Sequence, residues 1–348
     1  MRARDLGLAC GSLPPGKRNS IADVPGVAVG HATLIEADVR TGVTAVLPHD
    51  GDLFQDKPVA AAVVLNGFGK SVGLMQLNEL GTLETPILLT NTFAVGVCAT
   101  ALIRRAIAAD PEIGRQTSTV NPVVLECNDG YLNDIQAMAV TEAHADAAIA
   151  AAGEDFPTGA VGAGTGMSCF GLKGGIGSAS RRLRLDNATY HLGVLVLANF
   201  GRAGDLRLPD GRRVDPASPP KPDAGSCIIV IGTDIPLGHR QLSRVARRAG
   251  VGLAWCGSFW GNGSGDIALA FTTANRLPHE ADQDLIEYRM LAENRIDLLF
   301  QAAAEATQEA VLDALAAAET MVGRHGHQRV GLAEVLGRLV SGRARMSK

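Results

Sequence analysis

A serine flanked by glycines marks the segment Gly261–Asp266, which follows a helical pattern and precedes an alternating strand pattern. Because glycine has no Cβ, this turn can adopt backbone angles that are closed to other residues. A strained Gly263–Ser264 peptide would let the serine hydroxyl attack the preceding carbonyl and break the chain. The new N-terminal serine would carry a nucleophile and an α-amine, whose pKa near ~7.7 suits a general base. The motif predicts a self-processing hydrolase.

The plainer interpretation of Gly263-Ser264-Gly265 is a tight turn without chemistry. A nucleophile elbow of the α/β-hydrolase type requires a strand, then the serine, then a helix. The order here is helix, serine, strand. That order disfavours the elbow, and a serine that begins a strand is what an N-terminal nucleophile requires.

Polar residues also follow two apolar, strand-like runs. Glu126 and Tyr131 come after the first, and Asn199 ends the second. Glu126 can bind a substrate ammonium group through a charge-assisted hydrogen bond, and Tyr131 can donate to a developing oxyanion. The Asn199 amide can also donate into an oxyanion hole, where losing such a donor costs about 3–4 kcal/mol. The structural alternatives are an Asx-rich turn and a turn-forming asparagine.

Glycine-rich segments at 159–166 and 173–181 raise the question of nucleotide binding. Neither forms a strand–GxGxxG–helix unit or a GxxxxGK[ST] motif, so close approach of the backbone to a neighbouring strand explains the glycines better. The eight histidines do not cluster with acidic residues at metal-ligand spacing, and His325 and His327 are interpreted as part of a surface loop. We expect no metal and no organic cofactor.

Composition narrows the class of protein. The 348 residues are 46% hydrophobic with a net charge of −4, so we expect a large core and no nucleic-acid partner. Six cysteines without CxxC pairs favour buried thiols in a reducing compartment. The N-terminus lacks the apolar run of a signal peptide, and no apolar run is long enough for a membrane span. We therefore expect a cytoplasmic protein with no membrane partner.

Strand and helix patterns are mixed along the chain, which predicts an α/β layered domain. Strands are expected near 27–29, 44–47, 59–66, 87–89, 123–125, 193–198 and 227–231, and helices at 97–107, 141–152, 237–256 and 284–321. The segment 201–225, rich in proline and glycine, is expected to be an exposed loop. Because the apolar segments on either side are too short to fold alone, the chain is taken as a single domain, 1–348.

Eight motifs, taken together and in order, resemble peptidase family S58. This family of self-processing N-terminal-nucleophile hydrolases includes L-aminopeptidase/D-Ala-esterase-amidase and β-peptidyl aminopeptidase. The motifs lie at residues 19–31, 65–69, 86–92, 128–134, 162–167, 173–177, 198–201 and 263–266. The resemblance implies an αββα sandwich that cleaves itself between Gly263 and Ser264, into a large chain, 1–263, and a small chain, 264–348.

The resemblance further implies an aminopeptidase that releases N-terminal residues from small peptides, amides or esters, in some members with D- or β-amino acids. It implies self-association, with a tetramer of two-chain protomers expected. By position, Ser264 matches the nucleophile, Asn199 and Tyr131 match oxyanion or positioning groups, and Glu126 matches the anchor of the substrate amine.

Some members also use a hydroxyl and a glutamate two residues apart in the small chain. Thr307 and Glu309 are the nearest match. In a regular helix, residues i and i+2 do not share a face. The structural alternative is a Thr307 in the core and a Glu309 at the surface.

Three other functions fit parts of this pattern. An ω-amino amide hydrolase of the nylon-oligomer type would keep the processing and change the substrate. An acyltransferase of the ornithine acetyltransferase type would share the fold and the autocleavage. We associate both with a threonine nucleophile, whereas this chain has Ser264. A non-enzymatic oligomeric binding protein would show no ester or amide turnover.

Overall fold

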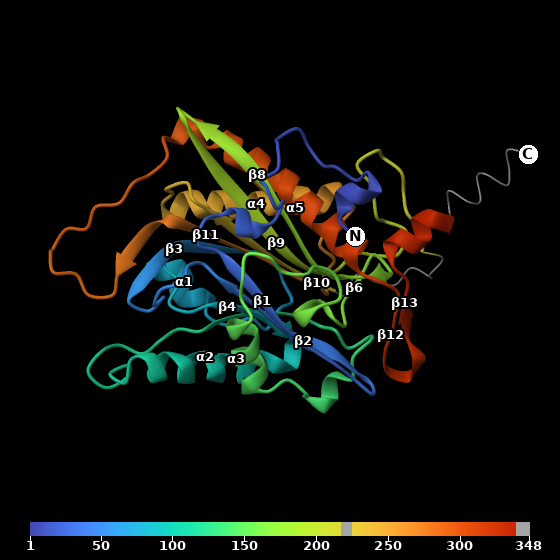
Figure 1. The fold of residues 1–348 in the computed structure, drawn as a ribbon, viewed down its shortest axis with the longest axis horizontal. Helices are drawn as coiled ribbons and strands as arrows, with labels where there is room; N and C mark the ends of the chain where they lie inside the picture. Colours follow the sequence, from blue (N-terminus) through green and yellow to red (C-terminus); the bar gives the residue numbers. More distant parts are fainter. Residues whose placement is uncertain (217–224, 339–348) are drawn as a thin grey trace, which may run out of the picture.

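The computed structural model describes residues 1–216 and 225–338, in which two β-sheets lie face to face between two layers of helices (Figure 1). The first sheet has the order β1-β2-β4-β5, with β1 (Ala28–Glu36), β2 (Val39–Leu47), β4 (Ile87–Asn91) and β5 (Val123–Cys127). The second has the order β3-β11-β10-β9-β8, with β3 (Asp56–Gly67), β8 (Gly175–Leu185), β9 (Ala188–Asn199), β10 (Ser226–Thr233) and β11 (Gly265–Pro278).

Helices cover the outer face of each sheet (Figure 1). Over the first sheet lie α2 (Val95–Ala109) and α3 (Glu142–Ala150), while α4 (His239–Trp255) and α5 (Asp297–Ala317) pack on the second. The short helix α1 (Leu74–Leu80) lies beside β3. Two small hairpins complete the fold, β6 (Ser168–Cys169) with β7 (Leu172–Lys173) and β12 (Met321–Val322) with β13 (Gln328–Arg329).

The central strands show why their sequences are continuously apolar. Along β10, Ile229 and Ile231 pack against α4 and α5, while Ile228 and Val230 face the other sheet. Successive side chains of a strand point to opposite faces, so a strand with a core on both sides has no polar face. The predicted α/β layered fold is confirmed.

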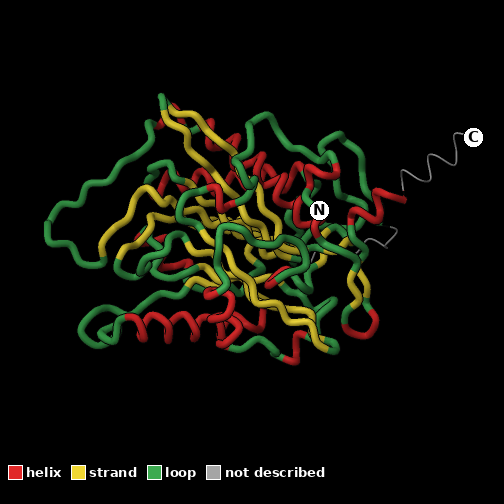
Figure 2. Tube along the Cα trace, in the orientation of Figure 1, coloured by secondary structure: helices red, strands yellow, loops and turns green. Residues whose placement is uncertain are grey.

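The longest predicted helix is wrong in its first part. The prediction covers 284–321, but α5 begins at Asp297, and residues 279–292 form a long exposed loop (Figure 2). Asn275 binds both the N–H and the carbonyl of Arg289, and the Leu291 N–H donates to the Pro236 carbonyl. These tertiary hydrogen bonds compete with helical ones and hold the end of the loop against β11.

The loop after β9 and the cysteines were also predicted from the sequence. Residues 201–216 of the predicted loop 201–225 form no strand or helix, but Leu206, Leu208 and Val214 are buried, so this part is not simply an exposed loop. Residues 217–224 lie outside the described residues. All six cysteines are buried and none forms a disulfide.

Within the described ranges, Thr92–Ala109 alone is long and apolar enough to span a membrane, and its inward face packs on the first sheet.

A buried ionic network joins the N-terminal segment to α5. The fully buried Arg181 of β8 binds the carboxylates of Glu305 and Glu309 at 3.1 and 3.0 Å, and Arg4 binds Glu309 at 2.6 Å. Burial alone would raise the pKa of Glu309, but the hydrogen bond from Arg4 and the charge of Arg181 outweigh it, so the pKa lies below its usual range. Asn19 donates a further hydrogen bond to Glu309.

Replacing Arg181 should destabilise the fold far more than replacing its neighbour. Arg181→Met leaves Glu305 and Glu309 buried without their common partner, which costs about 3–5 kcal/mol. Arg182→Met, at an exposed position, is the matched control. We expect a much lower midpoint of urea-induced unfolding for Arg181→Met and a nearly unchanged one for Arg182→Met. Equal midpoints would contradict a stabilising role of this network.

Candidate active site

The candidate site lies at one edge of the second sheet, where two strands end and two begin. In register across this edge, Gly67 of β3 pairs with Gly265 of β11, Gly265 with Ser226 of β10, and Ser226 with Asn199 of β9. Neighbouring strands lie about 4.8 Å apart, so the backbones at Gly265 and Asn199 are about 10 Å apart. The fold thus brings the predicted nucleophile and the predicted oxyanion donor to the same edge.

Hydrogen bonds hold both backbone groups of Ser264, its N–H and its carbonyl. Its N–H donates to the Gly261 carbonyl at 2.8 Å, which closes a four-residue turn over Asn262 and Gly263. Its carbonyl accepts hydrogen bonds from the Phe68 N–H and from the Asn66 amide of β3. The side chain is buried, and its Oγ donates to Asp266 Oδ1 at 3.0 Å. Ser264 therefore has a fixed position immediately before β11.

Glu126 approaches this edge from the first sheet. It is buried near the end of β5, where Oε1 accepts the Lys70 N–H at 2.9 Å and Oε2 accepts the Thr92 hydroxyl. A Cβ built on Gly69 would lie 3.8 Å from Glu126 Oε1 and 3.9 Å from the Gly265 Cα. One point beside Gly69 is therefore close to the Glu126 carboxylate and to the backbone next to Ser264, and the Ile267 side chain also borders it, with Cδ1 at 3.5 Å.

Asn199 bridges the two sheets. Its Oδ1 accepts the Ser168 N–H at 2.9 Å, and its Nδ2 donates to the Asn128 carbonyl, just after β5, at 2.9 Å. The Ser168 donor fixes which end of the amide carries oxygen. Since an amide nitrogen has two protons, the second N–H of Asn199 can still donate to a substrate.

Tyr131 lies in the turn after β5 and is held by the hairpin β12–β13. The His327 ring stacks on it with centroids 4.7 Å apart, and the Arg329 guanidinium lies 3.5 Å from the ring centroid. His327 also contacts the Tyr131 carbonyl through Nδ1. The predicted surface loop at 325–327 is thus part of the packing around a predicted site residue.

Thr307 and Glu309 are both buried in α5, so the structural alternative, which put Glu309 at the surface, is wrong. Glu309 belongs to the ionic network with Arg4 and Arg181. A Cβ on Gly252 of α4 would lie 2.8 Å from the Thr307 Cβ, so the threonine packs between the two helices. Among the described residues, no hydrogen-bond partner meets its buried hydroxyl. The structure therefore separates the environments of the two residues.

Sequence reasoning missed two buried charged residues beneath the site. Lys173 donates from Nζ to the carbonyls of Gly164, Met167 and Gly174, at 2.8–3.0 Å. Burial lowers the pKa of Lys173 to about 7 and raises that of Asp129 to about 7. The glycine-rich segments could have indicated this site. Their backbone carbonyls, at Gly164 and Gly174, accept hydrogen bonds from the Lys173 ammonium group.

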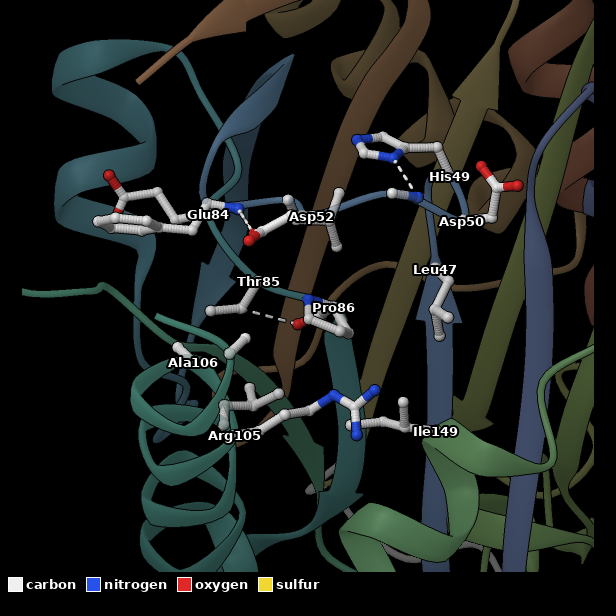
Figure 3. Close-up of a pocket in the computed structure, with 15 residues that line it drawn as sticks. Leu47, His49, Asp50, Asp52, Glu84, Thr85, Pro86, Arg105, Ala106 and Ile149 are labelled. Carbon is white, nitrogen blue, oxygen red and sulfur yellow. Dashed lines mark hydrogen bonds between the residues drawn. The ribbon is translucent and has the colours of Figure 1, made fainter. Parts of the chain in front are cut away.

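A separate cavity lies at the opposite end of the first sheet (Figure 3). It has a volume of about 310 Å³ and is lined by His49, Glu84 and Arg105 among other residues. Its buried polar groups already have partners, because Glu84 binds Lys57 and Asn121, and His49 contacts the Asp56 carbonyl and the Gly51 N–H. Nothing there matches the chemistry at Ser264. In the described part of the chain, no cluster of His, Cys, Asp or Glu could hold a metal ion.

The chain matches a known protein family and two known enzymes in sequence. The model of peptidase family S58 matches residues 19–329. A beta-peptidyl aminopeptidase, BapA, from Sphingosinicella microcystinivorans is 38% identical and covers 96% of this chain and 90% of its own length. The BapA of Sphingosinicella xenopeptidilytica is 37% identical, with 95% and 88% covered.

Solved structures agree over nearly the full length. A protein from Pyrococcus horikoshii superposes with a TM-score of 0.92 at 49% identity, covering 99% of both chains. A Burkholderia beta-aminopeptidase gives 0.90 at 40% identity, covering 98% of this chain and 99% of its own. The L-aminopeptidase D-Ala-esterase/amidase of Ochrobactrum anthropi, a prototype serine aminopeptidase with a variant of the Ntn hydrolase fold, gives 0.88 at 35% identity and covers 99% of both.

Proposed function

This chain belongs to peptidase family S58 and is a hydrolase of the serine aminopeptidase type, and we propose that Ser264 is its nucleophile. In this proposal the chain cleaves itself between Gly263 and Ser264, and the two fragments stay together. The enzyme then releases N-terminal residues from small peptides, amides or esters. The observation that carries the proposal is that Glu126 Oε1 and the Cα of Gly265, the residue after Ser264, both lie within 4 Å of one point beside Gly69.

The proposed turnover follows from the groups at the sheet edge. The free α-amine of Ser264 accepts the hydroxyl proton while Oγ attacks the scissile carbonyl. The second N–H of Asn199, with Tyr131 as a further positioning group, stabilises the oxyanion. As the C–N bond breaks, the leaving amine takes the proton. Water then attacks the acyl-enzyme ester, which releases the acid and restores the serine.

Glu126 accounts for the preference for a free amino terminus. A buried carboxylate with two fixed donors is already oriented, and Gly69 lies close both to it and to Gly265. A substrate ammonium group would form a charge-assisted hydrogen bond there. The relatives act on β-peptides or on L-amino-acid and D-alanine derivatives. A panel of α- and β-aminoacyl p-nitroanilides of both hands would assign the spacing and chirality for this chain.

We also propose that the two-chain protomers associate into a homo-oligomer, as the resemblance implies. The loop between β11 and α5 supports self-association, since it carries Leu285, Ile286 and Met290, which are 84, 48 and 59% exposed. Exposed apolar side chains that gather on one segment commonly mark an interface.

The first test is the intact mass of the denatured protein. Wild type should give two fragments, 1–263 and 264–348, while Ser264→Ala should stay at full length because the attacking hydroxyl is absent. Ser258→Ala, which removes another buried hydroxyl of the same loop, should still be cut. A full-length wild-type protein with aminopeptidase activity would refute the N-terminal-nucleophile mechanism.

The second test concerns the amine anchor. Glu126→Gln keeps the shape and removes the charge, so KM for an aminoacyl p-nitroanilide should rise about 10- to 100-fold, as expected for losing a hydrogen bond to a charged group. Glu79→Gln, at an exposed site on α1, is the control. An unchanged KM in Glu126→Gln would place the ammonium group elsewhere.

A third test fills the space between Glu126 and Gly265. An alanine Cβ at residue 69 meets its neighbours at 3.5–3.9 Å, which is ordinary contact, so Gly69→Ala should fold normally. It should nevertheless raise KM for the same substrates, because the methyl group stands where the ammonium group would lie. Gly96→Ala, where a Cβ meets nothing within 4 Å, is the matched control. A normal KM in Gly69→Ala would show that substrate does not use this space.

A further inference from the structure

The first cleavage needs a base that the mature enzyme does not need. Before the chain is cut, the Ser264 nitrogen is part of a peptide bond, and its lone pair is delocalised into the Gly263 carbonyl. An amide nitrogen is therefore no proton acceptor. The α-amine that serves turnover in the proposed function does not yet exist, so another group must take the proton from Ser264 Oγ.

Asp266 is placed to do this. Its Oδ1 lies 3.0 Å from Ser264 Oγ, and both side chains are buried. Residues i and i+2 of a strand point to the same side, so the start of β11 sets the two groups next to each other. An ionised carboxylate only accepts hydrogen bonds, which makes the Ser264 hydroxyl the donor in this contact.

The other titratable groups near this position are less suited. Glu126 already accepts the Lys70 N–H and the Thr92 hydroxyl, and it lies beyond Gly69. Burial, with smaller contributions from nearby carboxylates that include Asp266, raises the pKa of the Cys127 and Cys227 thiols well above their usual range. These thiols stay protonated and cannot accept the proton.

We propose that Asp266 is the general base for autocleavage of the Gly263–Ser264 bond; this inference rests on the proposed self-processing function. Asp266 Oδ1 takes the proton as Ser264 Oγ bonds to the Gly263 carbonyl carbon. The protonated Asp266 then gives that proton to the Ser264 nitrogen as the C–N bond breaks, which leaves an ester between Gly263 and Ser264. Water hydrolyses this ester to the Gly263 carboxylate, the free hydroxyl and the new α-amine.

The backbone contacts of Ser264 support this assignment. Its N–H is held by Gly261 and its carbonyl by Phe68 and Asn66. With both ends fixed, rotation about Cα–Cβ is the main freedom left to the hydroxyl, and the hydrogen bond to Asp266 restricts that rotation. The proton acceptor and the attacking oxygen are thus positioned by the same strand.

The test compares processing rates of Asp266→Asn, Asp313→Asn and wild type in cell-free translation, followed by intact mass. Asp313 of α5 is another buried carboxylate, and it is paired with Arg2. It controls for the loss of a buried charge. Asp266→Asn should be cut at least about 100-fold more slowly than wild type. Asp313→Asn should be cut at a rate close to that of wild type. Circular dichroism and size exclusion establish that the uncut Asp266→Asn chain is folded.

The outcomes separate this inference from the function on which it rests. A wild-type chain that is never cut would overturn the proposed self-processing itself. A wild-type chain that is cut, with Asp266→Asn cut at the same rate, would overturn only the role of Asp266. If Asp266→Asn does not fold, Asp266→Ala is translated with and without sodium formate. Cleavage that depends on formate supports the proposal, and cleavage independent of formate contradicts it.

Discussion

The pairing of β11 with strands on both sides is the constraint on which the site depends. Gly265 is in register with Gly67 and with Ser226, so the residue before it has one position relative to both neighbours. A slip of one residue would turn every side chain of β11 to the other face. It would exchange the apolar rows that face the two cores and would turn Asp266 to the other face of the sheet. The packing of the whole sheet therefore fixes the chemistry at its edge.

The same architecture explains how a chain cut before Ser264 can keep its fold. On the far side of the cut, β11 stays hydrogen-bonded to β3 and β10, and α5 stays packed on β8 and β9. Arg4 and Arg181 precede the cut and bind Glu309, which follows it. The Gly263–Ser264 bond follows the exposed Asn262 in a turn between α4 and β11, outside both elements. In a chain cut there, this ionic network would join the two fragments.

Local patterns in the sequence were enough to find the layered fold and the strand ends. Glu126 and Asn199 stand where an apolar run stops and Ser264 stands where one begins, and polar residues at strand ends commonly form sites. Their convergence depends on pairing between distant strands, which no local pattern contains. Glu309 shows the limit most clearly, because its partners Arg4 and Arg181 lie far away in the chain. The start of α5 was misjudged for the same reason, since Asn275 holds Arg289 in a non-helical conformation.

The most direct measurement of the central claim is to locate the acyl group during turnover. The enzyme is mixed with a slowly hydrolysed aminoacyl ester, quenched in acid, digested and sequenced by tandem mass spectrometry. If Ser264 is the nucleophile, the digest contains a peptide that begins at Ser264 and carries the acyl group on the serine oxygen. An acyl group on another residue, or a Ser264 still joined to Gly263 in active enzyme, would contradict it.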